Sequence, residues 1–119
     1  MKRLLYYTDV LPLLSKKEAA LDKIQRNLEI FSSNSDKIRV IWHPYEKCEE
    51  YMKLNHFELM DQYQKIIEDF KNGSFGEFDE TSDLKALADS CDAYYGDYSD
   101  AVYYMQESKK PVMIQNIDV

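Results

Sequence analysis

The chain has little of what marks disordered, disulfide-bonded or membrane-spanning proteins. Its 119 residues include only three glycines, three prolines, two cysteines and two histidines. With 45% hydrophobic residues and ten tyrosines, the composition excludes a disordered or collagen-like chain. No apolar run approaches the roughly 20 residues that a transmembrane helix needs. We therefore expect no direct insertion into a membrane.

The cysteines and the first residues favour a cytoplasmic protein. Cys48 and Cys91 lie far apart, form no CxxC pair, and have only His43 and His56 as companions, so neither a zinc site nor a disulfide framework is predicted. The N-terminal residues lack the length and the small-residue cleavage site of a signal peptide. We expect a reduced, cytoplasmic setting, with any position at the inner face of the membrane depending on a partner.

Basic residues are outnumbered by acidic ones. Fifteen Lys and Arg against 22 Asp and Glu give a formal charge of −7 and a pI near 4.8. Because this balance repels polyanions over most of the surface, nucleic acid is not expected as a partner. The length suits one core, and no repeat or linker divides the chain, so residues 1–119 are taken as a single domain.

Hydrophobic patterns predict an alternation of strands and helices. Short apolar or β-branched runs predict strands, and apolar residues spaced by three and four predict helices. The predicted strands cover 4–8, 38–43, 75–79, 93–95 and 111–115, of which 75–79 is the weakest. Four helices are predicted. The first follows a capping box formed by Ser15 and Glu18. The second covers 46–71 with a separate turn or kink within 51–55, the third begins behind 81–83, and the fourth covers 100–107. Gly73 is expected to end the second helix in a left-handed conformation.

This order predicts a three-layer, Rossmann-like α/β domain. Right-handed crossovers place helices on both faces of a parallel sheet, here with about five strands in the order 3-2-1-4-5. The carboxyl ends of such strands meet at one edge, where open α/β sheets bind their ligands. The loops expected at that edge are 8–11, 43–47, 80–83 and 96–100.

The loop after the fourth strand is the most informative of these. Gly96, Asp97 and Ser99 precede a helix whose free N–H groups favour an anion, so Ser99 can hold a phosphate there. The same residue types also form an ordinary N-cap and first turn, and Asp100 itself places a carboxylate at the positive helix end. Both interpretations stay open.

Two neighbouring loops carry further candidates. Thr81 and Ser82 can contact a ribose or phosphate, although one of them is also expected to cap the next helix. His43 and Tyr45 can form an acid–base pair or contact phosphate, whereas a His before Pro often only ends a strand. The chain has no Walker loop, GxGxxG or nucleophile elbow, so no residue is assigned to catalysis or metal binding and no cofactor is predicted.

Several segments resemble one protein family. The segments 91–99 (CDAYYGDYS) and 110–116 (KPVMIQN) are similar to the C-terminal, donor-binding half of bacterial CDP-glycerol glycerophosphotransferase-like proteins, which are two-domain GT-B glycosyltransferases of teichoic-acid synthesis. The likeness extends to segments 5–8, 41–44 and 79–84. The resemblance implies a domain that grips the nucleotide and diphosphate of CDP-glycerol. It carries binding roles onto Thr81, Ser82, Asp97 and Ser99.

The chain departs from the family at three points. His43 and Tyr45 stand where the family has Arg and His, and Asp100 stands where it has a second Ser, so the expected diphosphate site loses positive charge. The family reacts in a cleft between two domains, of which this chain has one. The resemblance therefore implies binding of CDP or CDP-glycerol without transfer by this chain alone, and an acceptor domain or a second copy as partner.

Two other classes fit the same order of elements. An acidic doubly wound domain can serve as a non-catalytic protein-interaction module that associates through its aromatic rim. A phosphoacceptor receiver domain is disfavoured, because the first strand ends in the single Asp9 and no suitably placed carboxylate follows Trp42.

Overall fold

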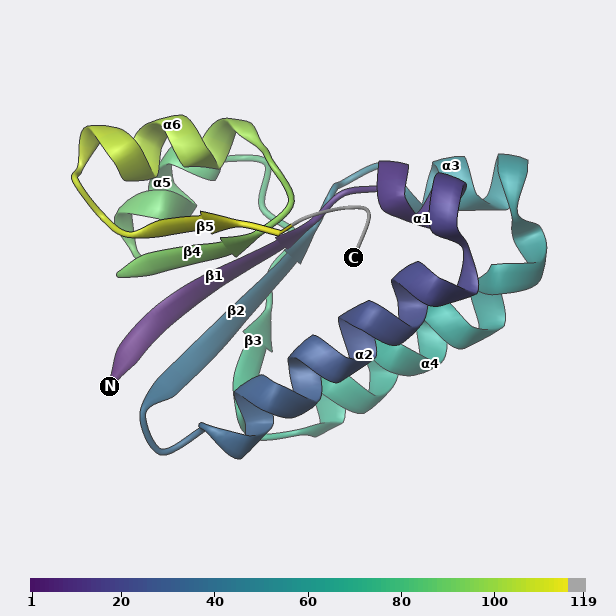
Figure 1. Ribbon diagram of the computed structural model, residues 1–119, viewed down its shortest axis with the longest axis horizontal. Helices are drawn as coiled ribbons and strands as arrows, with labels where there is room; N and C mark the ends of the chain where they lie inside the picture. Colours follow the sequence, from purple (N-terminus) through teal and green to yellow (C-terminus); the bar gives the residue numbers. More distant parts are fainter. Residues whose placement is uncertain (116–119) are drawn as a thin grey trace.

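The computed structural model describes residues 1–115 and contains one sheet of five parallel strands. The strands are β1 (Lys2–Thr8), β2 (Ile38–Pro44), β3 (Gly76–Phe78), β4 (Ala93–Gly96) and β5 (Val112–Ile114). Their order in the sheet is β3-β2-β1-β4-β5, which confirms the predicted order (Figure 1). Asn116, the last residue of the C-terminal segment that resembles the family, lies outside the described residues.

Helices cover both faces of this sheet, as predicted. They are α1 (Leu11–Lys16), α2 (Glu18–Ser33), α3 (Cys48–Asn55), the 3-10 helix η1 (Phe57–Leu59), α4 (Met60–Asn72), α5 (Leu84–Asp89) and α6 (Asp100–Glu107). The long helices α2 and α4 lie on one face, and α5 and α6 lie on the other (Figure 1). Within residues 1–115, every helix is too short or too polar to cross a bilayer.

The alternation of side chains along β1 builds a core on each face. Successive strand residues point to opposite faces, so Tyr6 packs with Phe31 and Trp42 under α2 and α4, whereas Tyr7 packs with the α5 and α6 core. Leu5, beside Tyr7 in the second core, is completely buried. Burying a large apolar side chain in this way contributes about 1.5–3 kcal/mol, so the central strand anchors both layers.

The first helical region differs from the prediction. Pro12 lies in the first turn of α1, where its missing N–H needs no partner. Ser15 lies inside that helix and donates to Leu11 O at 3.0 Å, so the predicted capping box with Glu18 is wrong. The helix α2 begins directly after Lys17, whose φ of 53° separates the two helices.

The predicted helix over 46–71 is divided into α3, η1 and α4. The break falls at His56, which has φ −144° and ψ 62° and whose ring Nε2 lies 3.0 Å from Leu14 O. A separate turn was expected just before this point, within 51–55. Gly73 is extended, with φ −80° and ψ 164°, so the predicted left-handed stop is wrong. The chain leaves α4 in extended form because β3 begins only three residues later.

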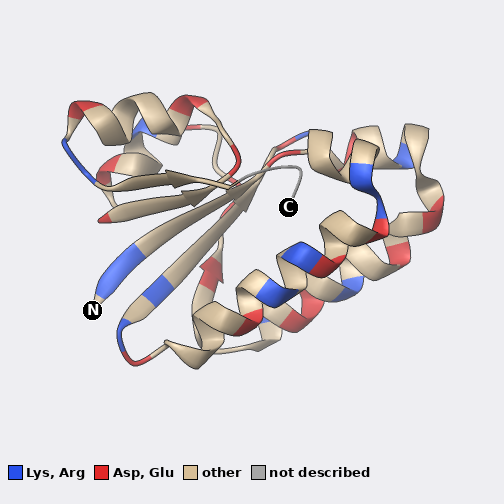
Figure 2. Cartoon of the chain, in the orientation of Figure 1, with Lys and Arg blue, Asp and Glu red and all other residues tan. Residues whose placement is uncertain are grey.

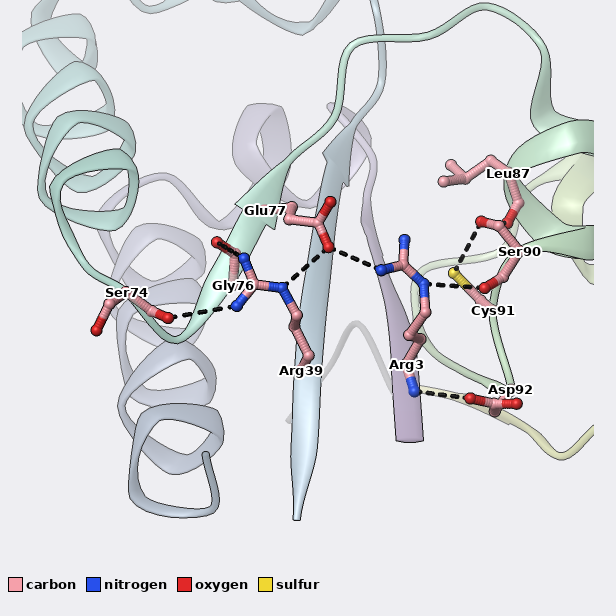
Figure 3. A network of polar contacts seen from close by, with 9 residues as sticks. All are labelled: Arg3, Arg39, Ser74, Gly76, Glu77, Leu87, Ser90, Cys91 and Asp92. Carbon is pink, nitrogen blue, oxygen red and sulfur yellow. Dashed lines mark hydrogen bonds and ion pairs between the residues drawn. The ribbon is translucent and has the colours of Figure 1, made fainter. Parts of the chain in front are cut away.

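An ion-pair network joins three strands at the amino end of the sheet (Figure 3). Arg3 and Arg39 are register partners on β1 and β2. The Glu77 Oε2 atom on β3 lies 2.8 Å from Arg3 Nη1 and 3.0 Å from Arg39 Nε. Two basic side chains that would otherwise repel each other are thus bridged by one carboxylate.

Candidate functional site

A cavity of about 720 Å³ lies at the carboxyl end of the sheet. All four loops that were expected to meet there contribute to its wall, and the remaining residues come from β1, α1, α3 and α5. Five of the seven predicted site residues line it, namely His43, Tyr45, Thr81, Ser82 and Ser99. Parallel topology therefore brings together residues that are more than 50 positions apart in the sequence.

Gly96 and Asp97 do not line the cavity. The Asp97 carboxylate accepts a hydrogen bond from Asp9 N and another from the Gln115 side chain, each at 2.8 Å. It thereby ties the end of β1 to the segment that follows β5. Gly96 has a φ of 137° and lies against the backbone of Tyr7. The structure gives both residues a role in joining strand ends.

Ser99 is the N-cap of α6, as the simpler interpretation predicted. Its hydroxyl oxygen accepts from Ala101 N at 3.3 Å and lies 2.9 Å from the Tyr94 hydroxyl. The Tyr94 hydroxyl also donates to the carbonyl of Asp97. The cap is therefore held by a buried strand residue, and Ser99 still forms part of the cavity wall.

Asp83 caps α5, so the prediction that Thr81 or Ser82 does so is wrong. The Asp83 carboxylate accepts from Ala86 N at 3.0 Å. Thr81 forms the preceding turn, in which its hydroxyl oxygen accepts from Asp83 N at 3.2 Å. A carboxylate is an equally good cap acceptor, and its use leaves Ser82 on the cavity wall without that task.

His43 is held in place from behind. Its Nδ1 atom lies 3.0 Å from Asp79 Oδ1, and the residue is only 2% exposed. The same carboxylate oxygen accepts from Thr81 N at 2.9 Å, which links the loops after β2 and β3. Within residues 1–115 no partner is recorded for His43 Nε2, and His43 lines the cavity. A ring oriented through one nitrogen is well placed to offer the other to a ligand.

The sequence did not single out four further residues of the wall. Tyr7, Asp9, Tyr51 and Tyr98 also line the cavity. Tyr7 lies near the end of β1, and Asp9 is the first residue of the loop that follows. In a parallel sheet, residues at these positions are candidates for a binding site. Tyr98 lies inside the predicted loop 96–100. Only the position of Tyr51 could not be predicted from the sequence, because it depends on how α3 packs at the carboxyl edge of the sheet.

The cavity wall is acidic. Asp9, Glu46 and Asp100 contribute carboxylates, and among residues 1–115 no Lys or Arg lines the cavity. Burial raises the pKa of Asp9, a hydrogen bond from Val10 N lowers it in part, and the charge of Asp97 adds to the rise. Figure 2 shows Lys and Arg at the amino ends of β1 and β2 and acidic residues in the loops at the opposite end of the sheet.

Within the described residues, these carboxylates are not part of a metal-binding cluster. Among residues 1–115, no group of three or more His, Cys, Asp or Glu is arranged to hold a metal ion. In comparisons with known proteins, no family model, curated protein or solved structure matches the chain. The fold and the composition of the cavity wall are therefore the observations on which a function rests.

Proposed function

We propose that the cavity binds a nucleotide-linked donor, and that the chain is a donor-binding domain of the CDP-glycerol glycerophosphotransferase type. The observation that carries this proposal is the convergence of five residues, selected from the sequence, on one cavity at the carboxyl edge of the sheet. Its volume of about 720 Å³ falls in the range of about 300–1,000 Å³ that is usual for small-molecule sites.

The position of the cavity supports the same proposal. The chain runs from β1 outward to β2 and β3, and then returns to β4 on the other side of β1, so the direction reverses between β1 and β4. Ligands of open α/β sheets bind in the crevice at this reversal. Asp9 after β1 and Ser99 after β4 both line the cavity.

Hydroxyl groups and ring faces supply plausible contacts for a nucleotide. Thr81 and Ser82 can donate to phosphate or ribose oxygens, whereas the Ser99 hydroxyl and the N–H groups of Ala101 and Val102 in the first turn of α6 already bond within the fold. The tyrosines of the wall offer surfaces on which a base can stack. In this proposal the domain binds CDP or CDP-glycerol in the cytoplasm but does not transfer the donor group alone, since the acceptor would be held by a partner domain.

Calorimetric titration of the protein with CDP and CDP-glycerol tests this proposal. We expect heat of binding and a raised melting temperature at millimolar ligand. Ser82→Ala removes a hydroxyl that is not needed for the α5 cap, and we expect it to weaken CDP binding about tenfold. Ser74→Ala, outside the cavity, is the matched control. Absence of both heat and thermal shift with CDP and CDP-glycerol would overturn the proposal.

A second candidate function is a protein-interaction module, and one surface favours it. Leu11 on α1, Leu54 on α3 and Phe57 on η1 are 61%, 78% and 71% exposed, and α3 contacts both α1 and η1. Exposed apolar side chains in neighbouring elements often mark a protein contact. Sedimentation velocity distinguishes this function: it predicts a dimer that Leu54→Glu converts to a monomer, and a wild-type monomer at all concentrations would rule out self-association.

A further inference from the structure

The charge of the cavity favours a cation over a bare diphosphate. Asp9, Glu46 and Asp100 are its ionisable acids. The four loops at this edge contain a single basic residue, Lys47, which is exposed and does not line the cavity. A cavity walled by one sign of charge concentrates ligand groups of the opposite sign. Among residues 1–115, no Lys or Arg of the wall would offset the repulsion between these carboxylates and the negative charges of a diphosphate.

Four tyrosines of the wall add to this preference. Tyr7, Tyr45, Tyr51 and Tyr98 line the same cavity as the three carboxylates. The rings of Tyr45 and Tyr51 are stacked, with centroids 6.4 Å apart and planes inclined by 17°. The face of a tyrosine ring is electronegative and attracts ammonium groups, most strongly alkylated ones that hold water weakly. Rings together with carboxylates form the usual surroundings of a bound organic cation.

A nearly buried tyrosine presents an accessible hydroxyl to the cavity. Tyr7 is only 6% exposed, and its hydroxyl has no hydrogen-bond partner among residues 1–115. In this part of the chain, every side-chain nitrogen or oxygen atom that is shielded from solvent has a hydrogen-bond partner. The Tyr7 oxygen has none and is therefore accessible, and Tyr7 lines the cavity. Burial, and then the charge of Asp9, raise the pKa of Tyr7, which keeps the group protonated and able to donate. The cavity thus offers a ligand one further hydrogen-bonding group.

We infer that the cavity binds an organic ammonium group. Resting on the proposed function, the donor is then a nucleotide-linked amino alcohol, in which the ammonium lies among the tyrosines and carboxylates and the diphosphate lies toward Thr81 and Ser82. An ammonium group also offsets one charge of the diphosphate, so such a ligand is less strongly repelled by the acidic wall than CDP-glycerol.

Titration of the full chain with CDP-choline, CDP-glycerol, CDP and choline separates the possibilities. We expect CDP-choline to bind about tenfold more tightly than CDP-glycerol, whose glycerol group carries no positive charge. Equal or tighter binding of CDP-glycerol would overturn the inference and leave the proposed function intact. Binding of choline and CDP-choline but not of CDP or CDP-glycerol would support the inference and overturn the proposed function. Binding of none of the four would overturn both.

Two variants test whether the lining carboxylates cause the preference for an organic ammonium group. Glu46→Gln and Asp100→Asn each remove one lining charge, and we expect each to reduce the ratio of CDP-choline to CDP-glycerol affinity several-fold. Glu49→Gln removes an exposed charge on α3 that does not line this cavity, so the ratio should stay unchanged. The ratio is insensitive to a general loss of folded protein, which affects both ligands alike. An equal change in all three variants, or a change in none, would contradict the inference.

Discussion

Gly96 on β4 and Tyr7 on β1 are register partners whose backbones approach so closely that a Cβ atom on Gly96 would lie 2.1 Å from Tyr7 O. Gly96 also has a φ of 137°, which a residue with a side chain rarely adopts. Because the obstacle is backbone in the central strand, it cannot move aside. We expect Gly96→Ala to lower the free energy of unfolding by at least about 3 kcal/mol.

Urea unfolding followed by circular dichroism measures this loss, and Gly73→Ala is its matched control. Gly73 has negative φ, and an added Cβ atom would lie 3.2 Å from the ring of Phe75, a side chain that can shift slightly. We expect a change below about 1 kcal/mol for the control. Similar losses in the two variants would show that the contact with Tyr7 O is not the cause.

Two buried tyrosines on adjacent strands differ in what their hydroxyls contact. The Tyr94 hydroxyl bonds both Ser99 and the Asp97 carbonyl, whereas no partner is recorded for the Tyr7 hydroxyl within residues 1–115. Tyr94→Phe leaves those buried groups unpaired, so we expect a loss of about 1–3 kcal/mol in the free energy of unfolding. Tyr7→Phe should change it by less than about 0.5 kcal/mol. The comparison uses the same denaturation experiment, and a larger loss for Tyr7→Phe would mean that its hydroxyl bonds within the fold.

The strand order could be predicted because it depends on local patterns and on the handedness of the crossovers. Helix boundaries were harder to predict where several sequence signals compete. Pro12 suits both the break after a strand and the first turn of a helix, and the structure places it in the first turn of α1. Thr81, Ser82 and Asp83 are all good caps, and only the geometry of the turn selects Asp83.

The candidate site could likewise be predicted where it follows from topology, but not where it depends on contacts between residues far apart in the sequence. Topology placed four loops at one edge, and residues from all four line the cavity. The role of Asp97 could not be predicted, since its partners Asp9 and Gln115 are 88 and 18 residues away along the chain. Neither spacing nor composition indicates that its carboxylate would be used inside the fold.

Both cysteines should be inert in the folded protein. Burial raises the pKa of the Cys48 thiol to about 11, although a hydrogen bond with Tyr63 lowers it in part, and burial also raises the pKa of Cys91. Each residue is a free thiol and 1% exposed. At pH 8 we expect reaction with a disulfide reagent at less than about 1% of the rate in urea. Rapid modification of either thiol without denaturant would indicate that its surroundings open readily.

The Arg3, Glu77 and Arg39 network gives a pH dependence whose direction follows from its hydrogen bonds. Burial alone raises the pKa of Glu77, but the hydrogen bonds and charges of Arg39 and Arg3 outweigh it, so the pKa lies below its ordinary value of 4.5. The folded chain therefore holds this proton more weakly than the unfolded chain. The resulting stability is present above pH 4.5 and is lost as the pH falls through the lower pKa of the folded state. The side chains are 37–43% exposed, so we expect less than about 1 kcal/mol.

Unfolding of the wild type and Glu77→Gln at pH 7 and near pH 3 measures this contribution. We expect the variant to be less stable at pH 7 by a few tenths of a kcal/mol up to about 1 kcal/mol, and the difference to shrink toward zero in acid. Glu68→Gln, which removes an exposed charge from α4, controls for the general effect of net charge. A difference for Glu77→Gln that is the same at both pH values would mean that shape or packing, and not the ionised carboxylate between the two arginines, stabilises this end of the sheet.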